Sequence, residues 1–319
     1  MKVLVTGGAG FIGRWVVKQL LDDHHQVWVI DNLANGCKEN LQEFAAHSGM
    51  RDIFRGDITD VATLSGLFEN HFDICFHLAA SINVQDSIDN PQATFTNDVA
   101  GTFHVLEQCR LTRTKMVFMS TCMVYDAAMH PDGIRETDTT KPTSPYAGSK
   151  IAAENMVLSY HHAYNLPVVV LRPFNTYGPY QKSSGEGGVV AIFIRKKLSG
   201  EFLSIYGDGT QTRDLLYVED CARFVTQAGY SSVVNGEIVH AGAGRDIAIN
   251  DLAKLVAGDE APMEHVPHIH PQSEIAKLQC NYSKAKRLLN WEPRVSLEEG
   301  IARTEVWIRS TKGDQACDQ

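Results

Sequence analysis

Tyr146 and Lys150 form the residue pair in this chain best suited to moving a proton. On a helix, residues four apart share one face, so the Lys150 ammonium would lie beside the Tyr146 phenol. A neighbouring cation favours the phenolate and lowers the pKa of the tyrosine toward working pH. Thr121 ends a preceding strand, where it could hydrogen-bond the same oxygen. The three residues predict a base for a hydroxyl group during hydride transfer.

A glycine string between a predicted strand and a predicted helix indicates a dinucleotide site. Residues 7–13 read GGAGFIG. Glycines permit a tight turn and let the backbone approach a pyrophosphate, whose charge is stabilised by the helix N-terminus. The expected cofactor contacts in this string are Gly7, Gly10, Phe11, Ile12 and Gly13.

Asp31 closes the second predicted strand, and its position favours NAD over NADP. A carboxylate there accepts hydrogen bonds from a ribose diol and repels a 2′-phosphate. Arg14 is a nearby cation that keeps NADP as the lesser alternative. Asn32 neighbours Asp31. Asp57 and Ile58 end another strand, where the carboxylate could meet the adenine amino group or cap a turn.

The hydrophobic pattern supplies the elements that must position these residues. Short β-branched runs predict strands at 2–6, 27–30, 53–56, 74–78, 115–120 and 168–172. Apolar residues at three- and four-residue spacing predict helices at 13–21, 98–109 and 146–164. The alternation predicts an α/β fold, a Rossmann-like doubly wound parallel sheet with a smaller, discontinuous C-terminal substrate domain. We expect residues 1–172 and 212–243 in the NAD-binding domain, 173–211 and 244–310 in the substrate domain, and a polar tail at 311–319.

Composition excludes several classes of protein. The 319 residues are 44% hydrophobic and 21% charged with a net charge of −9, which is typical of a globular protein. No basic block could cover nucleic acid or an anionic membrane, and the apolar runs are too short to span a bilayer. The start lacks a signal peptide's apolar region and cleavage site, so we expect a cytoplasmic protein. We expect no metal, because His265, His268 and His270 share a proline-containing loop without an evident fourth ligand.

The chain resembles the extended short-chain dehydrogenase/reductase family, specifically its NAD-dependent nucleotide-sugar epimerases and dehydratases. The motifs that carry the resemblance occur in the family's order: VTGGAGFIG at the start, DNLANG (31–36), FHLAA (76–80), STCMVY (120–125), YAGSK (146–150), RPFNTYGP (172–179), GDGTQTRDLLYVED (207–220) and NWEPRVSLEEGI near the end. The resemblance implies Thr121, Tyr146 and Lys150 as catalytic residues and NAD retained through the cycle. It adds cofactor contacts at Leu78, Ala79 and Ala80.

The resemblance also implies a nucleoside-diphosphate sugar as substrate and a homodimer joined through the helices expected at 98–109 and 146–164. The implied substrate contacts are Ser81, Thr121, Asn175, Val189 and Arg213. An arginine suits a diphosphate, because its fork of donors matches phosphate oxygens. A surface ion pair with Asp208 or Asp214 is the alternative role for Arg213.

The residues after Thr121 distinguish between the reactions of such enzymes. Related dehydratases carry Thr-Asp-Glu where this chain has Thr121-Cys122-Met123. Methionine can neither donate nor accept a proton, and a neutral cysteine is a poor substitute for a carboxyl group. We therefore expect an NAD-dependent nucleotide-sugar epimerase that acts at C4 through a transient 4-keto sugar. The alternatives are a dehydratase that uses Cys122, for 4,6- or atypical elimination, and a non-catalytic dinucleotide-binding sensor.

Two further positions depart from the family pattern. Asp98 occupies the place usually held by asparagine before Val-x-Gly-Thr. Late in the chain, where relatives carry an arginine that grips the nucleotide, residues 268–274 read HIHPQSE. A histidine of this segment could replace the missing cation, or the nucleotide could bind differently.

Overall fold

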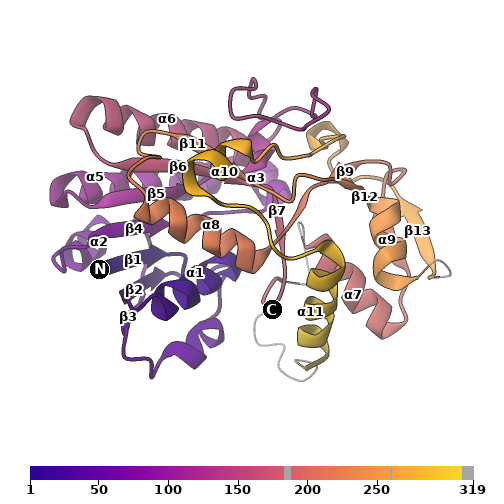
Figure 1. Cartoon of the computed structure of the whole chain (residues 1–319), viewed down its shortest axis with the longest axis horizontal. Helices are drawn as coiled ribbons and strands as arrows, with labels where there is room; N and C mark the ends of the chain where they lie inside the picture. Colours follow the sequence, from indigo (N-terminus) through magenta and orange to yellow (C-terminus); the bar gives the residue numbers. More distant parts are fainter. Residues whose placement is uncertain (183–187, 259–260, 311–319) are drawn as a thin grey trace.

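The computed structural model describes residues 1–182, 188–258 and 261–310, so the predicted polar tail lies outside the described residues. Within them, seven parallel strands form one sheet (Figure 1). Its order is β11-β6-β5-β4-β1-β2-β3. The strands are β1(Lys2–Thr6), β2(Gln26–Asp31), β3(Met50–Arg55), β4(Ile74–His77), β5(Lys115–Met119), β6(Val168–Pro173) and β11(Ile238–Ala241). The chain winds outward on both sides of β1 and β4, which confirms the predicted doubly wound α/β fold.

Helices cover both faces of this sheet. Helices α1(Phe11–Asp22) and α8(Val218–Tyr230) pack on the face that carries Val3 and Val5. Helices α2(Val61–Phe68), α5(Thr102–Thr112) and α6(Pro145–Tyr164) pack on the face that carries Leu4. Successive strand residues point to opposite faces, so a strand covered on both sides is apolar throughout.

A second group of elements forms the right-hand part of Figure 1. Helices α7(Val189–Ser199), α9(Ile249–Ala257) and α11(Leu297–Ser310) pack around an apolar cluster of their own, which includes Phe193, Leu252 and Ile301. Short strand pairs join them: β8(Leu203–Tyr206) with β13(Met263–Val266), β9(Thr212–Arg213) with β12(Ile247–Ala248), and β10(Leu215–Tyr217) with β7(Asn175–Tyr177). The division into two domains at the boundaries given above stays a prediction.

The helix expected at 98–109 is part of a longer, interrupted one. Helix α4(Pro91–Phe95) continues into the π-helical turn η2(Thr96–Gly101) and then into α5. Helix α6 matches its prediction closely, because the Ser144 side chain caps its start, accepting from the Ala147 amide at 3.2 Å, and Asn165 ends it with a φ of +51°.

The remaining short elements are η1(Lys38–Phe44), α3(Val84–Asp89), η3(Cys122–Val124), η4(Pro271–Ser273) and α10(Ser283–Leu289). Among the described residues, no helix combines the length and the apolar character needed to cross a membrane.

Candidate active site

The glycine string makes the turn between β1 and α1. Gly7 has a φ of +70°, and a Cβ there would lie 2.7 Å from the amide nitrogen of Ala79. A Cβ on Gly13 would lie 2.0 Å from the Gly7 carbonyl oxygen. On Gly10, the N-cap of α1, a Cβ would meet that oxygen alone among the described atoms, at 3.2 Å. The turn is thus tight against the protein and open at the helix N-terminus, which fits a dinucleotide pyrophosphate.

Asp31 is the last residue of β2 and lies beside this turn. Its Oδ2 accepts from the Ala9 amide at 2.9 Å, and its Oδ1 accepts from the Leu33 amide at 2.8 Å. Burial raises the pKa of the Asp31 carboxyl above its ordinary value. Each oxygen keeps a lone pair that a ribose hydroxyl could use.

The other residues expected around the cofactor surround the same edge of the sheet. Phe11 and Ile12 begin α1. The Asn32 side-chain amide donates to Asp57 Oδ2 at 2.8 Å, and Ile58 follows as a buried residue. Leu78, Ala79 and Ala80 follow β4, where the Ala79 amide donates to Thr6 Oγ1 at 3.2 Å.

Arg14, the cation that could favour NADP, is held by other partners. Its Nε donates to the Asn40 carbonyl at 3.2 Å, and its guanidinium lies 3.8 Å from the ring centre of Tyr180. It also forms an ion pair with Glu43. These contacts occupy the guanidinium within the protein, which supports NAD as the cofactor.

Thr121, Tyr146 and Lys150 come together beyond the carboxyl end of β5. The Thr121 and Tyr146 hydroxyls are hydrogen-bonded, and Thr121 Oγ1 also accepts from the Met123 amide at 3.1 Å. Lys150 lies one helical turn after Tyr146 on α6, and its Nζ donates to the Met119 carbonyl at 3.0 Å. All three side chains are buried. The phenol thus has a hydroxyl partner, with an ammonium on the same helix face.

The pKa of Tyr146 is raised in this environment, whereas the sequence predicts a lowered one. Burial is the largest cause, and the Asp98 carboxylate adds to it, while the hydrogen bond with Thr121 acts in the opposite direction. Burial lowers the pKa of Lys150, and Asp98 and Glu154 partly offset that effect. The expectation of a lowered pKa is therefore wrong for the protein by itself, because desolvation of the phenol outweighs its neighbours.

Cys122 follows Thr121 and belongs to an apolar cluster with Val124, Phe174 and Ile275. Burial raises the pKa of its thiol to about 12, and the nearby Arg213 charge only partly opposes this. A thiol with that pKa stays protonated at neutral pH, so it is no thiolate base. Its surroundings favour packing, and a catalytic role for Cys122 stays a prediction.

The residues expected to contact substrate lie on several elements around this point. Ser81 follows β4, and its amide donates to Asp98 Oδ1 at 2.7 Å. Asn175 begins β7, and its buried Oδ1 has no hydrogen-bond partner among the described residues. Val189 is the first residue of α7. The Asn175 oxygen is an acceptor that a bound hydroxyl or amide could satisfy.

Arg213 lies on β9 and contacts the segment where the family pattern breaks. Its guanidinium donates to the Ile275 carbonyl at 2.8 Å and pairs with Glu274. Glu274 also pairs with His268, whose Nε2 lies 2.6 Å from its second oxygen. Arg213 therefore forms its ion pair with Glu274, whereas the sequence suggested Asp208 or Asp214 as the partner. His268 pairs with the same Glu274 carboxylate.

A buried polar network beneath the site was not anticipated from the sequence. Glu154 accepts from Arg172 Nε at 2.8 Å and from the Ser120 hydroxyl. Arg172 also donates to the Tyr125 hydroxyl, which lies 2.8 Å from His240 Nε2. The one available signal was spacing, since Glu154 follows Lys150 by four residues, as Lys150 follows Tyr146.

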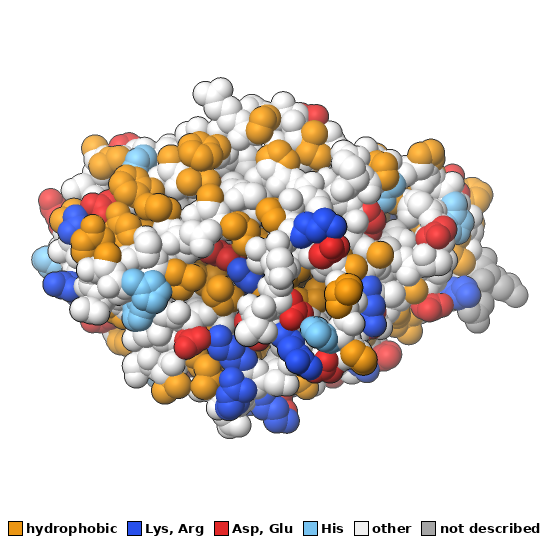
Figure 2. Space-filling view, turned by 90° about the horizontal axis from the view of Figure 1, so that it is seen from above, with side chains coloured by type: hydrophobic (Ala, Val, Ile, Leu, Met, Phe, Trp, Pro, Cys, Tyr) orange, Lys and Arg blue, Asp and Glu red, His pale blue; other side chains and the backbone are white. Residues whose placement is uncertain are grey.

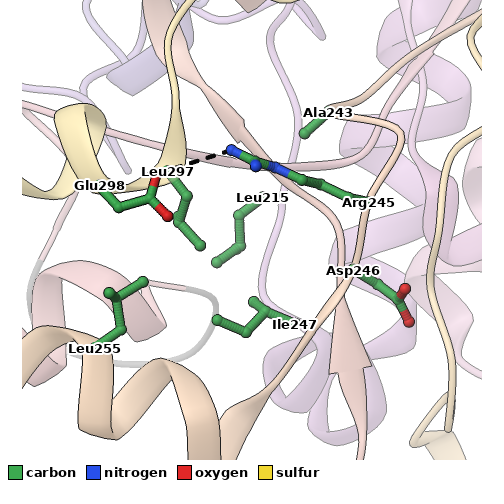
Figure 3. A pocket seen from close by; sticks show the side chains of 8 residues that line it. All are labelled: Leu215, Ala243, Arg245, Asp246, Ile247, Leu255, Leu297 and Glu298. Atoms are coloured by element: carbon green, nitrogen blue, oxygen red, sulfur yellow. Dashed lines mark ion pairs between the residues drawn. The ribbon is translucent and has the colours of Figure 1, made fainter.

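A surface cavity of about 170 Å³ lies elsewhere, between β10, the segment before β12, α9 and α11 (Figure 3). An ion pair of 3.9 Å joins Arg245 and Glu298, two of the residues that line it (Figure 3). The residues that line it include none of the predicted site residues. In the described part of the chain, no three His, Cys, Asp or Glu side chains are placed to hold a metal.

Comparison with known proteins agrees with this geometry. Residues 3–242 match the model of the NAD-dependent epimerase/dehydratase family. The chain is 37% identical over 317 residues to the UDP-glucose 4-epimerase of Mycolicibacterium smegmatis, covering 97% of this chain and 99% of that protein. The X-ray structure of Pal from Bacillus thuringiensis is 66% identical, with a TM-score of 0.96 over 97% of this chain and 99% of Pal.

A second similar structure contains the expected cofactor. The UDP-glucose 4-epimerase of Thermus thermophilus in complex with NAD is 33% identical, with a TM-score of 0.88 over 97% of this chain and 99% of that one. A nucleotide-sugar decarboxylase and a dTDP-glucose 4,6-dehydratase are also among the similar proteins.

Proposed function

Because the chain belongs to the NAD-dependent epimerase/dehydratase family, we propose that it is a nucleotide-sugar epimerase acting at C4 through a transient 4-keto sugar. The observation that carries the proposal is the constellation beyond β5. Thr121 is hydrogen-bonded to Tyr146 there, while Cys122 and Met123 follow without a carboxyl group. This arrangement can take a proton from a hydroxyl and return it, but it lacks the two carboxyl groups that related dehydratases carry directly after the threonine.

NAD fits the residues at the carboxyl edge of the sheet. Gly10 leaves the N-terminus of α1 open to the pyrophosphate, and Asp31 offers its carboxylate to the ribose diol. Asn32, Asp57 and Ile58 would border the adenine, while Lys150 and Tyr146 would face the nicotinamide end. When bound, NAD accepts a hydride from the sugar carbon and later returns it.

Tyr146 is the proton carrier of the cycle. Its phenolate accepts the proton of the C4 hydroxyl as the hydride leaves C4, and Thr121 orients that hydroxyl through its own hydrogen bond. Once the keto sugar has turned over and presents the other face of C4 to the cofactor, Tyr146 would return the proton to the C4 oxygen as that carbon is reduced. Because burial raises the pKa of Tyr146, the phenolate depends on the positive charges of Lys150 and of the oxidised cofactor.

Arg213, Asn175, Ser81 and Val189 would hold the nucleotide sugar. Arg213 would bind the diphosphate in exchange for its ion pair with Glu274, the carboxylate that also pairs with His268. UDP-sugars are the first substrates to test, since the epimerase relatives named above act on UDP-glucose.

A dehydratase is the second candidate, and the 4,6-dehydratase among the similar proteins favours its inclusion. It would need Cys122 as an acid or base, which its burial disfavours. Proton NMR of the products separates the two candidates. Purified protein with NAD would be offered uridine, thymidine, guanosine and cytidine diphosphate sugars. A stereoisomer of unchanged mass supports the epimerase. A product lighter by one water contradicts it, and no turnover of any sugar despite bound NAD points to a dinucleotide sensor.

We further propose a homodimer joined through α4, α5 and α6 and a cytoplasmic location. Phe95 is 57% exposed and Phe103 is 40% exposed on this side. In the view from above, apolar side chains gather at the end of the molecule where α5 and α6 lie (Figure 2). Sedimentation would test the dimer: Phe95→Glu should yield monomers, whereas Phe202→Glu, at an exposed position between α7 and β8, should not. A monomeric wild type would refute it.

A further inference from the structure

Asp98 is a buried carboxylate at the point where the long helix before β5 widens. It lies in the π-helical turn η2, and 1% of its surface is exposed. Its backbone carbonyl oxygen accepts a hydrogen bond from the Thr102 hydroxyl at 2.6 Å. Single π-helical turns inside α-helices frequently occur at functional sites.

The carboxylate of Asp98 connects two parts of the active site. Its Oδ1 accepts from the Ser81 amide at 2.7 Å and from the Asn97 side chain at 2.8 Å. Its Oδ2 accepts from the Ser149 hydroxyl at 3.4 Å. Ser81 belongs to the segment that we assign to substrate, and Ser149 lies on α6 between Tyr146 and Lys150. Asp98 is thus hydrogen-bonded both to the substrate segment at Ser81 and to the catalytic helix α6 at Ser149.

The charge of Asp98 acts on the proton carrier as well as on its cation. It raises the pKa of Tyr146, and it offsets the effect of burial on the pKa of Lys150. The other groups that act on Tyr146 are Cys122 from η3 and the hydroxyl of Thr121. Glu154 acts on Lys150 but belongs to the ion pair with Arg172. Asp98 is therefore the carboxylate that both Tyr146 and Lys150 experience.

We propose that Asp98 is a positioning residue whose negative charge keeps the proton on Tyr146 until oxidised NAD and Lys150 together outweigh it. A neutral asparagine could make similar hydrogen bonds to Ser81 and Ser149, but it could not supply this charge. The carboxylate thus couples formation of the phenolate to the charge of the bound cofactor. The inference rests on the proposed role of Tyr146, but its test requires no substrate.

The test is a tyrosinate titration of NAD-loaded protein by ultraviolet absorbance. The signal of Tyr146 is the part that disappears in Tyr146→Phe. Asp98→Asn should increase the tyrosinate fraction of Tyr146 at a given pH by roughly tenfold, because removing one nearby negative charge favours the phenolate. Asp126→Asn, which removes an exposed carboxylate paired with Lys141, should leave the titration unchanged.

Lys150 requires its own comparison, because Asp98→Asn also makes its ammonium easier to deprotonate. The same titration in a Lys150→Met background isolates the direct effect on Tyr146. An increase of the same sign in both backgrounds supports the proposal. An unchanged Tyr146 titration in the Lys150→Met background overturns it, even if the enzyme epimerises sugars. An increased tyrosinate fraction of Tyr146 in both backgrounds would support the role of Asp98 even if the enzyme epimerised none of the sugars tested.

Discussion

Lys150 donates to the carbonyl oxygen of Met119 at 3.0 Å, which ties the N-terminal part of α6 to the end of β5. Glu154, one turn later, accepts from Ser120 and pairs with Arg172 at the end of β6. Tyr146, Lys150 and Glu154 are spaced four apart and share one face of α6. This face is therefore fixed to two strand ends by buried polar contacts, and the phenol of Tyr146 is held beside Thr121.

Replacing Tyr146 with phenylalanine should abolish epimerisation while NAD stays bound. The phenol is the only proton carrier in our mechanism, and general acid–base catalysis contributes about 10²- to 10⁴-fold. We expect a loss of at least that order, with little change in thermal unfolding because the ring remains in place. Product NMR and the absorbance of released cofactor measure both effects. Wild-type activity in this variant would refute the mechanism.

Replacing Cys122 with alanine should leave epimerisation within a few-fold of wild type. Its pKa of about 12, caused mainly by burial, keeps the thiol neutral and outside the proton transfers. The substitution should instead lower the free energy of unfolding by about 1 kcal/mol, as expected when a small buried side chain is shortened. Initial rates and urea unfolding measure the two. A loss of turnover without a loss of stability would favour an eliminating enzyme.

Replacing Asp31 with asparagine should weaken the preference for NAD over NADP. Unit charges 4 Å apart repel by about 1 kcal/mol in water, so removing the carboxylate should change the ratio of the two affinities by about fivefold or more. Calorimetry on cofactor-free protein measures each affinity, and Asp126→Asn, which removes an exposed carboxylate paired with Lys141, is the control. An unchanged ratio would show that Asp31 does not face the ribose.

Replacing Arg213 with alanine should weaken UDP binding by roughly tenfold to a hundredfold. This follows from about 1.5–3 kcal/mol for hydrogen bonds to a charged group. NAD should bind as before, because Arg213 contacts the segment around Glu274 and not the glycine turn. Arg245→Ala, at the cavity in Figure 3, is the control. Equal UDP affinities for wild type and Arg213→Ala would remove Arg213 from the substrate site.

Stability should fall as the pH drops from about 6.5 toward 3. Burial lowers the pKa of both His77 and His240 to about 3. The folded protein keeps them neutral while the unfolded chain binds their protons below pH 6.5, so the stability present above that pH is lost on acidification. In this range each histidine should lower the free energy of unfolding by about 1.4 kcal/mol for every unit by which the pH falls.

Urea unfolding at a series of pH values measures this slope. His240→Gln, which has nothing to protonate, should remove about half of the contribution from the two histidines. A slope unchanged by that substitution would show that His240 does not titrate in this way.

The sequence was sufficient to predict the end of β2 and the glycine turn, because both depend on local residue types, whereas β3 begins at Met50 and ends at Arg55, before the expected end. Gly7 needs a positive φ and Asp31 directly ends an apolar strand, so each is visible in a few neighbouring letters. The same holds for α6, which has Ser144 before its start and Asn165 after its end.

Other features depend on contacts between distant residues and could not be predicted locally. Glu274 lies 61 positions from Arg213, and His240 lies 115 positions from Tyr125. The π-helical turn at Asp98 carries no compositional signal. The raised pKa of Tyr146 was missed because the spacing of Tyr146 and Lys150 shows the cation but not the burial of the phenol.

The reaction in D₂O tests hydride transfer at C4 most directly. The enzyme with NAD and a UDP-sugar substrate found by the NMR panel would be incubated in D₂O, and the product analysed by mass spectrometry and proton NMR. If the hydrogen removed from C4 is returned from the cofactor, the epimer carries no deuterium on carbon. Deuterium at C3 or C5, the carbons that flank the C4 keto group, would show that one of them exchanges its proton with solvent, and deuterium at C4 would show that the hydrogen there comes from solvent. Either result contradicts simple epimerisation at C4.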